Sequence, residues 1–228
     1  FWRKISRKDG CKGVSENAPH IRMEETMDKK TMLIKAVYAG FMIGIGGIVY
    51  LSVDNKAIGS LLFSFGLLTI VTQGFCLYTG KVGFMKKVNE LWDMAVIVLG
   101  NFGGTFIAAL LAKGAGLAIS STELAGKKLA CPLDKVFLLS VFCGVMMYLA
   151  IDNFNKAKNI VFVIAPVMIF ILSGFEHSIA NMFYFHLAGI YSGKMFLYLL
   201  VMVAGNGVGA KVFSGINSLA DRSGEGRK

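Results

Sequence analysis

The sequence predicts an all-α protein that spans a membrane six times. Of its 228 residues, 55% are hydrophobic and 17% are charged, whereas a soluble domain carries about 25% charged residues. The apolar residues fall into successive runs whose lengths lie near the roughly 20 residues that a membrane-spanning helix needs. Any one run would also suit a buried helix of a soluble protein, but six in succession favour the membrane.

The runs differ in length and regularity. In chain order they are Thr31–Val53, Ala57–Gly80, Met94–Ala112, Val136–Ile151, Asn159–Gly193 and Met195–Ala210. The fourth run is short, and we expect its helix to extend at the N-terminal end. The fifth is too long for one span. We therefore predict six helices, with the second and the fifth broken.

The two ends of the chain are polar. Residues 1–30 form a basic N-terminal segment without the apolar stretch of a signal peptide. Met23 would serve as a natural start, so residues 1–22 are either an added extension or a basic arm that lies on anionic lipid. We divide the chain into this segment, a transmembrane domain at 31–212 and a tail at 213–228, and we expect little order in residues 1–22 and from Ser218 onward.

Basic residues predict the orientation. Lysine and arginine concentrate in the N-terminal segment, in the Lys81–Lys87 and Lys156–Lys158 loops and in the tail. Because cytoplasmic loops carry the excess of basic residues, both termini should lie on the cytoplasmic side of the plasma membrane. The net charge of +10 then reflects topology, and no basic patch interleaved with aromatics indicates nucleic-acid binding. The cysteines have no metal-ligand spacing, so neither a metal nor another cofactor is expected.

An ionisable pair interrupts the fifth run. Glu176 and His177 stand side by side in an apolar stretch, where an ionisable group costs roughly 2.5–3.5 kcal/mol on insertion scales. Such groups usually face a water-filled cavity or a transport path. The pair therefore indicates a pore that moves a small solute past a histidine. The alternative is an interior histidine with satisfied hydrogen bonds.

The two halves of the chain contain matching motifs. Gly74-Phe75 and Gly100-Asn101 in the first half correspond to Gly174-Phe175 and Gly205-Asn206 in the second. Each half holds three spans, so the second copy must be inserted upside down, as in the inverted repeats of transport proteins. We expect each asparagine to cap a broken helix or to bond across the pore. Ordinary glycine-mediated packing is the alternative explanation.

Three motifs resemble those of the formate–nitrite transporter family, over roughly Met32–Val212. They are Phe63–Leu67 with Gly74–Lys81, Gly174–Met182, and Gly205-Asn206. The resemblance implies an aquaporin-like fold and a homopentamer with one pore in each protomer. It also implies transport of a small monovalent weak-acid anion such as formate, nitrite, hydrosulfide or lactate.

The resemblance also assigns pore residues. His177 matches the central histidine, with Thr79 and Asn206 within hydrogen-bond reach of it. The outer constriction matches Phe63, Leu67 and Phe170, and the inner one matches Leu77, Tyr78 and Met147. Lys128 matches a vestibule lysine that attracts anions, although the adjacent Lys127 and a solvated loop lysine remain alternatives. Glu176 and Asn181 lie in the motif at the break of the fifth helix, where we expect Glu176 to hold helix ends or Lys128.

These residues suggest a mechanism. Lys128 would concentrate the anion at the outer mouth. A proton, from His177 directly or through water, would then neutralise it, because a bare anion loses too much hydration in an apolar constriction. The partners are therefore a small anion, a proton and the lipid bilayer.

Two other functions compete with this one. An aquaporin-like channel for neutral small solutes would share the shape, but none of the three prolines follows an asparagine, so the Asn-Pro-Ala motif is missing. An intramembrane enzyme could use Glu176 and His177 as acid and base, but no nucleophile or metal cluster accompanies them. We therefore predict a transport protein and not an enzyme.

Overall fold

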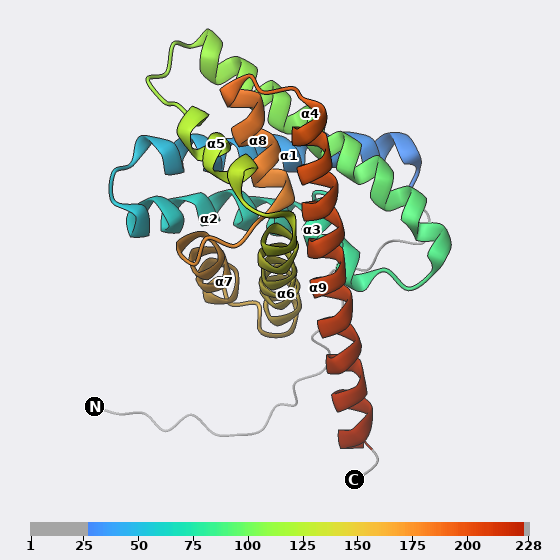
Figure 1. Ribbon diagram of the computed structural model, residues 1–228. Coiled ribbons are helices and arrows are strands. Elements are labelled where there is room, and N and C mark those ends of the chain that lie inside the picture. The colour runs from blue at the N-terminus through green and yellow to red at the C-terminus, as the bar shows by residue number, and fades with distance from the viewer. Residues whose placement is uncertain (1–26, 226–228) are drawn as a thin grey trace, which may run out of the picture.

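The computed structural model describes the backbone of residues 27–225 and the side chains of residues 27–220. Within this range the chain is helical and contains no strand. The α-helices are α1 (Lys29–Ser52), α2 (Lys56–Gln73), α3 (Tyr78–Lys81), α4 (Leu91–Gly114), α5 (Thr122–Ala130), α6 (Leu133–Ala157), α7 (Val161–Leu172), α8 (Ser178–Ala188) and α9 (Gly193–Glu225), with 3-10 turns η1 (Val82–Phe84) and η2 (Val88–Glu90). Figure 1 shows these helices gathered in one bundle, from which the C-terminal part of α9 projects.

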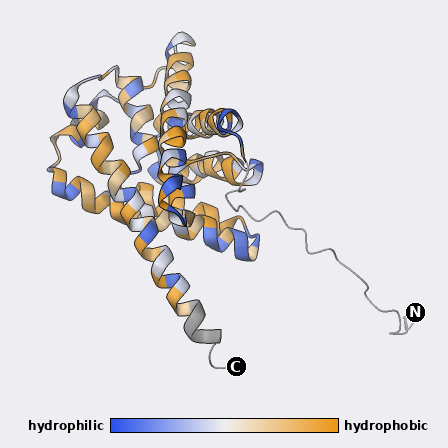
Figure 2. Cartoon of the chain, turned by 90° about the vertical axis from the view of Figure 1, so that its right-hand side faces the viewer, coloured by the Kyte–Doolittle hydropathy of each residue, from blue (hydrophilic) through white to orange (hydrophobic). Residues whose placement is uncertain are grey.

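Five of the described helices are long and apolar enough to cross a membrane. They are α1, α2, α4 together with η2, α6 and α9, and α7 is a shorter apolar helix. Hydrophobic residues run along these helices, and hydrophilic residues gather at helix ends and loops (Figure 2). This arrangement is that of a multi-pass membrane protein, as the apolar runs predicted.

In both the second and the fifth apolar run, a glycine in the left-handed conformation follows the first helix of the run. Gly74 follows α2 with a φ of 65°, and Gly174 lies between α7 and α8 with a φ of 70°. A residue with a Cβ is strained at such a φ, whereas glycine adopts it at little cost. After each glycine the chain runs without helical structure as far as Leu77 or His177, and a new helix then begins. The second and fifth apolar runs therefore each hold two helices.

Glycines allow the long helices to pack closely. α1 packs chiefly against α4, and α6 packs chiefly against α9. A Cβ added at Gly40 of α1 would overlap the backbone of Asn101, and one added at Gly144 of α6 would overlap the backbone of Asn206. The backbones thus approach as small-residue interfaces in membranes allow, and each contact brings an asparagine into the centre of the bundle.

Three segments differ from the sequence-based expectation. α6 extends beyond Val136–Ile151 at both ends: the extension at the N-terminal end was expected, and the extension at the C-terminal end is an addition to that expectation. α9 continues to Glu225, so our expectation of little order from Ser218 was wrong for most of that segment. The side chain of Asn217 bonds Asp152 of α6 at 3.1 Å, which ties this part of α9 to the bundle. α5 was not expected as a helix, and residues 1–22 lie outside the described residues.

Substitutions at two adjacent glycines of α4 can test how closely α4 packs against α1. A Cβ at Gly104 would overlap backbone atoms of α1, whereas one at Gly103 would meet no atom within 4 Å. We expect Gly104→Ala to lower the stability of the folded protein by about 1–3 kcal/mol through overpacking, seen as a lower melting temperature in detergent. Gly103→Ala should leave it unchanged or raise it slightly, because alanine favours helix. Equal melting temperatures for the two variants would contradict the packing described above.

Candidate functional site

His177 lies at the start of α8, in the middle of the bundle. Its Nδ1 accepts a hydrogen bond from the backbone N–H of Ala180 at 3.1 Å, and its Nε2 lies 2.9 Å from Oγ1 of Thr79. A nitrogen that accepts an N–H carries no proton of its own, so the geometry assigns the neutral tautomer with the proton on Nε2. The imidazole therefore caps α8 and donates its Nε2–H to Thr79.

Two asparagines hold the helix breaks. The Oδ1 of Asn101 accepts from the backbone N–H of Tyr78, the first residue of α3, at 2.9 Å. The Oδ1 of Asn206 accepts from the backbone N–H of Ser178, the first residue of α8, also at 2.9 Å. Each Nδ2 donates to two backbone carbonyls: those of Ala36 and Cys76 for Asn101, and those of Ser140 and Glu176 for Asn206. Asn206 thus bonds the backbone on both sides of His177.

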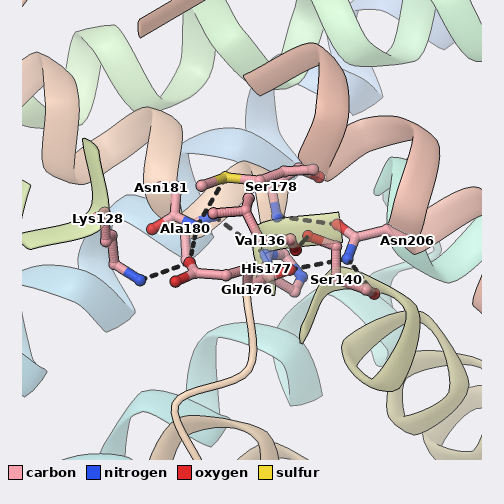
Figure 3. Close-up of polar contacts among 10 residues, drawn as sticks. Lys128, Val136, Ser140, Glu176, His177, Ser178, Ala180, Asn181 and Asn206 are labelled. Carbon is pink, nitrogen blue, oxygen red and sulfur yellow. Dashed lines mark hydrogen bonds and ion pairs between the residues drawn. The ribbon is translucent and has the colours of Figure 1, made fainter. Parts of the chain in front are cut away.

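Glu176 is the centre of a buried polar cluster (Figure 3). Its Oε2 accepts from Nζ of Lys128 at 2.6 Å and from Nδ2 of Asn181 at 2.7 Å. The side chains of Glu176 and Lys128 are only 6% and 14% exposed. The two opposite charges thus compensate each other, and the Asn181 amide adds a hydrogen bond to the carboxylate.

The helix α5 places Lys128 and separates it from Lys127. Lys127 forms an exposed ion pair with Glu123 one helical turn earlier, and its hydrogen bond holds the pKa of Glu123 below the ordinary value. Lys128 points toward Glu176 (Figure 3). Of the two lysines that the sequence offered, Lys128 is therefore the one directed at the predicted site.

A cavity of about 160 Å³ joins Lys128 to His177. It is lined by Tyr50, Leu124, Lys128, Phe170, Ile171, Gly174, Phe175, His177, Ala180, Asn181 and Tyr184. We call it the Lys128 cavity. The sequence analysis missed Tyr50 and Tyr184, because tyrosines near helix ends are common in membrane proteins and nothing local distinguishes these two.

Apolar side chains pack beside the Lys128 cavity, where Phe170 lines it next to His177. The ring of Phe170 stacks on the imidazole of His177 at 5.3 Å between centroids, and Phe63 meets Phe170 edge-on at 6.2 Å. Leu67 follows Phe63 by one helical turn on the same buried face of α2. Leu67 also lines a pocket of about 10 Å³, which we call the Leu77 pocket. Its lining consists of Leu67, Ile70, Val71, Phe75, Leu77, Gly80, Lys81 and Ile151.

Two residues predicted for the inner constriction lie outside the lining of the Leu77 pocket. The hydroxyl of Tyr78 donates to the backbone oxygen of Val203 at 2.9 Å, so its tip is held against α9. Met147 is buried in α6. Their part in a constriction stays a prediction.

The fold and this histidine-centred site define a multi-pass membrane transport protein. A family model described as formate/nitrite transporter matches residues 15–220. The chain therefore belongs to the formate/nitrite transporter family, whose members are channels and transporters and not enzymes.

Named relatives and solved structures agree with this membership. The chain is 32% identical to "Formate channel FocA" of Haemophilus influenzae over 57% of its own length and 52% of that protein. It is 28% identical to "Formate channel FocB" of Escherichia coli over 68% and 65%. The matches thus span about half to two thirds of the length of these relatives. The structure resembles "Pentameric formate channel with formate bound" with a TM-score of 0.74 and 23% identity, over 85% of this chain and 97% of that one.

The Lys128–Glu176 pair can be tested against its exposed neighbour. Lys128→Met leaves the Glu176 carboxylate buried without its cation, which should cost about 3 kcal/mol and lower the melting temperature in detergent. Lys127→Met removes only a solvated pair and should have little effect. A double variant, Lys128→Met with Glu176→Gln, should recover much of the loss. Equal melting temperatures for Lys128→Met and Lys127→Met would contradict the buried pair.

Proposed function

We propose that this protein is a channel for small monovalent weak-acid anions, which cross its narrowest part as neutral acids. Membership of the formate/nitrite transporter family supports the substrate class. The observation that carries the proposal is the apolar barrier beside a single neutral imidazole, between the Lys128 cavity and the Leu77 pocket. An aquaporin-like function is not favoured, because the named relatives are formate channels.

The barrier favours the neutral form of the solute. Phe63, Leu67 and Phe170 are each no more than 3% exposed and offer no hydrogen bond to replace the hydration of an ion. An unpaired charge in such surroundings costs far more than the neutral acid does. A strong-acid anion such as chloride cannot accept a proton and is excluded on the same ground.

His177 acts as a hydrogen-bond donor in this proposal. With its proton on Nε2 and its Nδ1 capping α8, direct loss of the Nε2 proton would leave an imidazolate at an apolar site. The proton that neutralises the solute therefore comes from water in the Lys128 cavity. The imidazole then holds the acid by an Nε2–H bond that replaces its bond to Thr79.

Lys128 attracts anions only weakly at a distance, because Glu176 compensates its charge. Its contribution is local: the ammonium lines the same cavity as His177. Lys128→Glu would place a second carboxylate beside Glu176, and anion uptake should fall.

We also infer that the chain forms six crossings in two inverted repeats, with both termini cytoplasmic. Matching contacts support the repeat. Phe75 stacks on Tyr38 with centroids 5.4 Å apart, and Phe175 stacks on Phe142 with centroids 5.3 Å apart. The asparagine bonds at the two breaks match in the same way. Of each two matching contacts, one lies within the first half of the chain and the other lies within the second half.

A homopentamer follows from the same proposal. The described helices expose many large apolar side chains, which must face lipid or another subunit, and the similar solved channel is pentameric. Native mass spectrometry of the protein released from mild detergent should show five copies in each particle. A monomer that transports at full rate would contradict this inference.

His177→Asn tests the role of the imidazole. Asparagine is a favoured N-cap, so α8 should form, but the side chain ends short of the position of Nε2. In proteoliposomes we expect formate uptake to fall about tenfold at every pH, the equivalent of one hydrogen bond of about 1.4 kcal/mol. The increase of uptake toward acid pH should keep its shape, because the solute takes its proton from water.

Two outcomes would contradict this assignment. An unchanged rate would remove His177 from the transport path. A rate that loses its pH dependence in the variant would make His177 itself the proton donor. Size-exclusion chromatography serves as the folding control: the variant should elute at the same volume as the wild type.

A further inference from the structure

Tyr78 is hydrogen-bonded through its backbone and through its side chain to two different helices. Its backbone N–H donates to the Oδ1 of Asn101 at 2.9 Å, and its hydroxyl donates to the carbonyl oxygen of Val203 at 2.9 Å. Asn101 belongs to α4 in the first half of the chain, whereas Val203 belongs to α9 in the second half. Tyr78 therefore joins the helix break of the first half to the last long helix of the second half.

The hydroxyl of Tyr78 occupies a space that a glycine of α9 leaves open. A Cβ added at Gly207 would lie 2.7 Å from the hydroxyl oxygen, closer than real Cβ atoms approach, and 3.9 Å from the ring carbon that carries the hydroxyl. Val203 precedes Gly207 by one helical turn, so in a regular α-helix its carbonyl also accepts from the N–H of Gly207. A carbonyl oxygen has two lone pairs and can accept both bonds. The glycine thus allows the phenol to reach the backbone of α9.

The phenol reaches α9 beside the asparagine that holds the second helix break. Asn206 directly precedes Gly207, and its Oδ1 accepts from the backbone N–H of Ser178 at 2.9 Å. Asn101 holds the corresponding N–H of Tyr78 in the first half. The phenol is therefore a direct link between the two parts of the chain that these asparagines hold.

The helix α3 depends on such bonds for its position. It has four residues, Tyr78–Lys81, which is about one turn and far shorter than a helix that is stable by itself. Its second residue is Thr79, which is buried and whose Oγ1 lies 2.9 Å from the Nε2 of His177. A displacement of α3 by about 1 Å would stretch this contact beyond hydrogen-bond distance. The bond between Thr79 and His177 therefore depends on what holds α3.

We propose that Tyr78 is a positioning residue for the central histidine. Its phenol couples α3 to α9 and thereby holds the hydroxyl of Thr79 at the Nε2–H of His177. This role differs from that of a constriction residue, because it belongs to the hydroxyl and its bond to Val203 and not to the width of the ring. The effect of Tyr78 on transport rests on the proposed function, whereas its effect on the hydrogen bond of His177 does not.

The chain offers a matched control for the loss of this bond. The hydroxyl of Tyr198, which is buried in α9 to the same extent as Tyr78 is in α3, donates to the carbonyl oxygen of Cys131 at 2.7 Å. Cys131 lies between α5 and α6, so this bond does not hold α3. Tyr78→Phe and Tyr198→Phe each remove one phenol-to-carbonyl bond of α9 and keep the ring, but only Tyr78→Phe releases α3. Their melting temperatures in detergent should fall by similar amounts, so a difference between their effects on His177 is not a general loss of stability.

The ring nitrogens of His177 report the position of Thr79 without a transport assay. Solid-state NMR of the full chain in lipid, labelled at the histidine nitrogens, separates protonated from unprotonated ring nitrogens, and the spectrum of His177→Asn identifies the signals of His177. Thr79→Val removes the acceptor and gives the signal for complete loss of the bond. We expect Tyr78→Phe to move the Nε2–H signal of His177 toward that of Thr79→Val, and Tyr198→Phe to leave it at the wild-type position.

Gly207→Ala removes the same bond in a second way. The added Cβ would displace the hydroxyl of Tyr78, so the signal of His177 should move as it does in Tyr78→Phe. In the double variant the hydroxyl is absent, and the ring carbon lies at an ordinary contact distance from the Cβ, so Gly207→Ala should add little to Tyr78→Phe. Gly215→Ala, at a position of α9 where a Cβ meets no atom within 4 Å, should leave the signal unchanged.

Formate uptake into proteoliposomes tests the consequence for transport. Under the proposed function Thr79 competes with the acid for the Nε2–H of His177, so a displaced Thr79 lets the imidazole hold the acid more tightly. A solute that binds more tightly also leaves more slowly. We expect Tyr78→Phe to lower both the half-saturating formate concentration and the maximal rate by roughly threefold, a part of one hydrogen bond. Tyr198→Phe should lower neither.

Three results would overturn the positioning role: a His177 signal that Tyr78→Phe leaves unchanged, an equal shift in Tyr198→Phe, or an effect of Gly207→Ala that is the same with and without the hydroxyl of Tyr78. A shifted signal with wild-type formate kinetics would count against the proposed function and leave the positioning role standing. An unshifted signal would count against the positioning role alone.

Discussion

The structure depends on how the backbone is satisfied where two helices are interrupted inside the bundle. In the hydrocarbon region no water is present to bond a free N–H or carbonyl, so irregular backbone persists only where protein supplies the partners. Asn101 and Asn206 supply them, each with one acceptor and two donor bonds to backbone groups. Both side chains are fully buried, and the glycines at positions 40 and 144 let the helices come close enough to place them.

The geometry of the site follows from the hydrogen bonds of Asn101 and Asn206, which we call the two clamps. Because Asn206 holds the backbone of Glu176 and Ser178, the residue between them is held in the interior. Its imidazole completes the start of α8 and meets Thr79, which the first clamp positions through α3. The ring of Phe170 then stacks on the imidazole. The histidine at the centre of the proposed pore therefore also stabilises the start of α8.

Much of this arrangement could be predicted from local sequence. The apolar runs located the spanning helices, and the paired Gly-Asn motifs indicated which polar residues stabilise the breaks. α5 was missed because nine amphipathic residues produce no span signal, although Ser121, the acidic Glu123 and the terminal lysines are ordinary helix-end signals.

Other features depend on contacts that local sequence does not encode. The direction of the Tyr78 hydroxyl is set by a carbonyl of α9, 125 residues away. The partner of Lys128 lies 48 residues further along the chain.

Under the proposed function, the choice of amides at positions 101 and 206 has a consequence. A carboxylate or an imidazole in the same places would exchange protons with the solution on either side, and the helix breaks would loosen or tighten as the gradient changed. The side chain of asparagine has no group that titrates in the physiological range. The architecture can therefore remain the same in acid and in neutral surroundings, while in the proposed function the solute alone changes its charge.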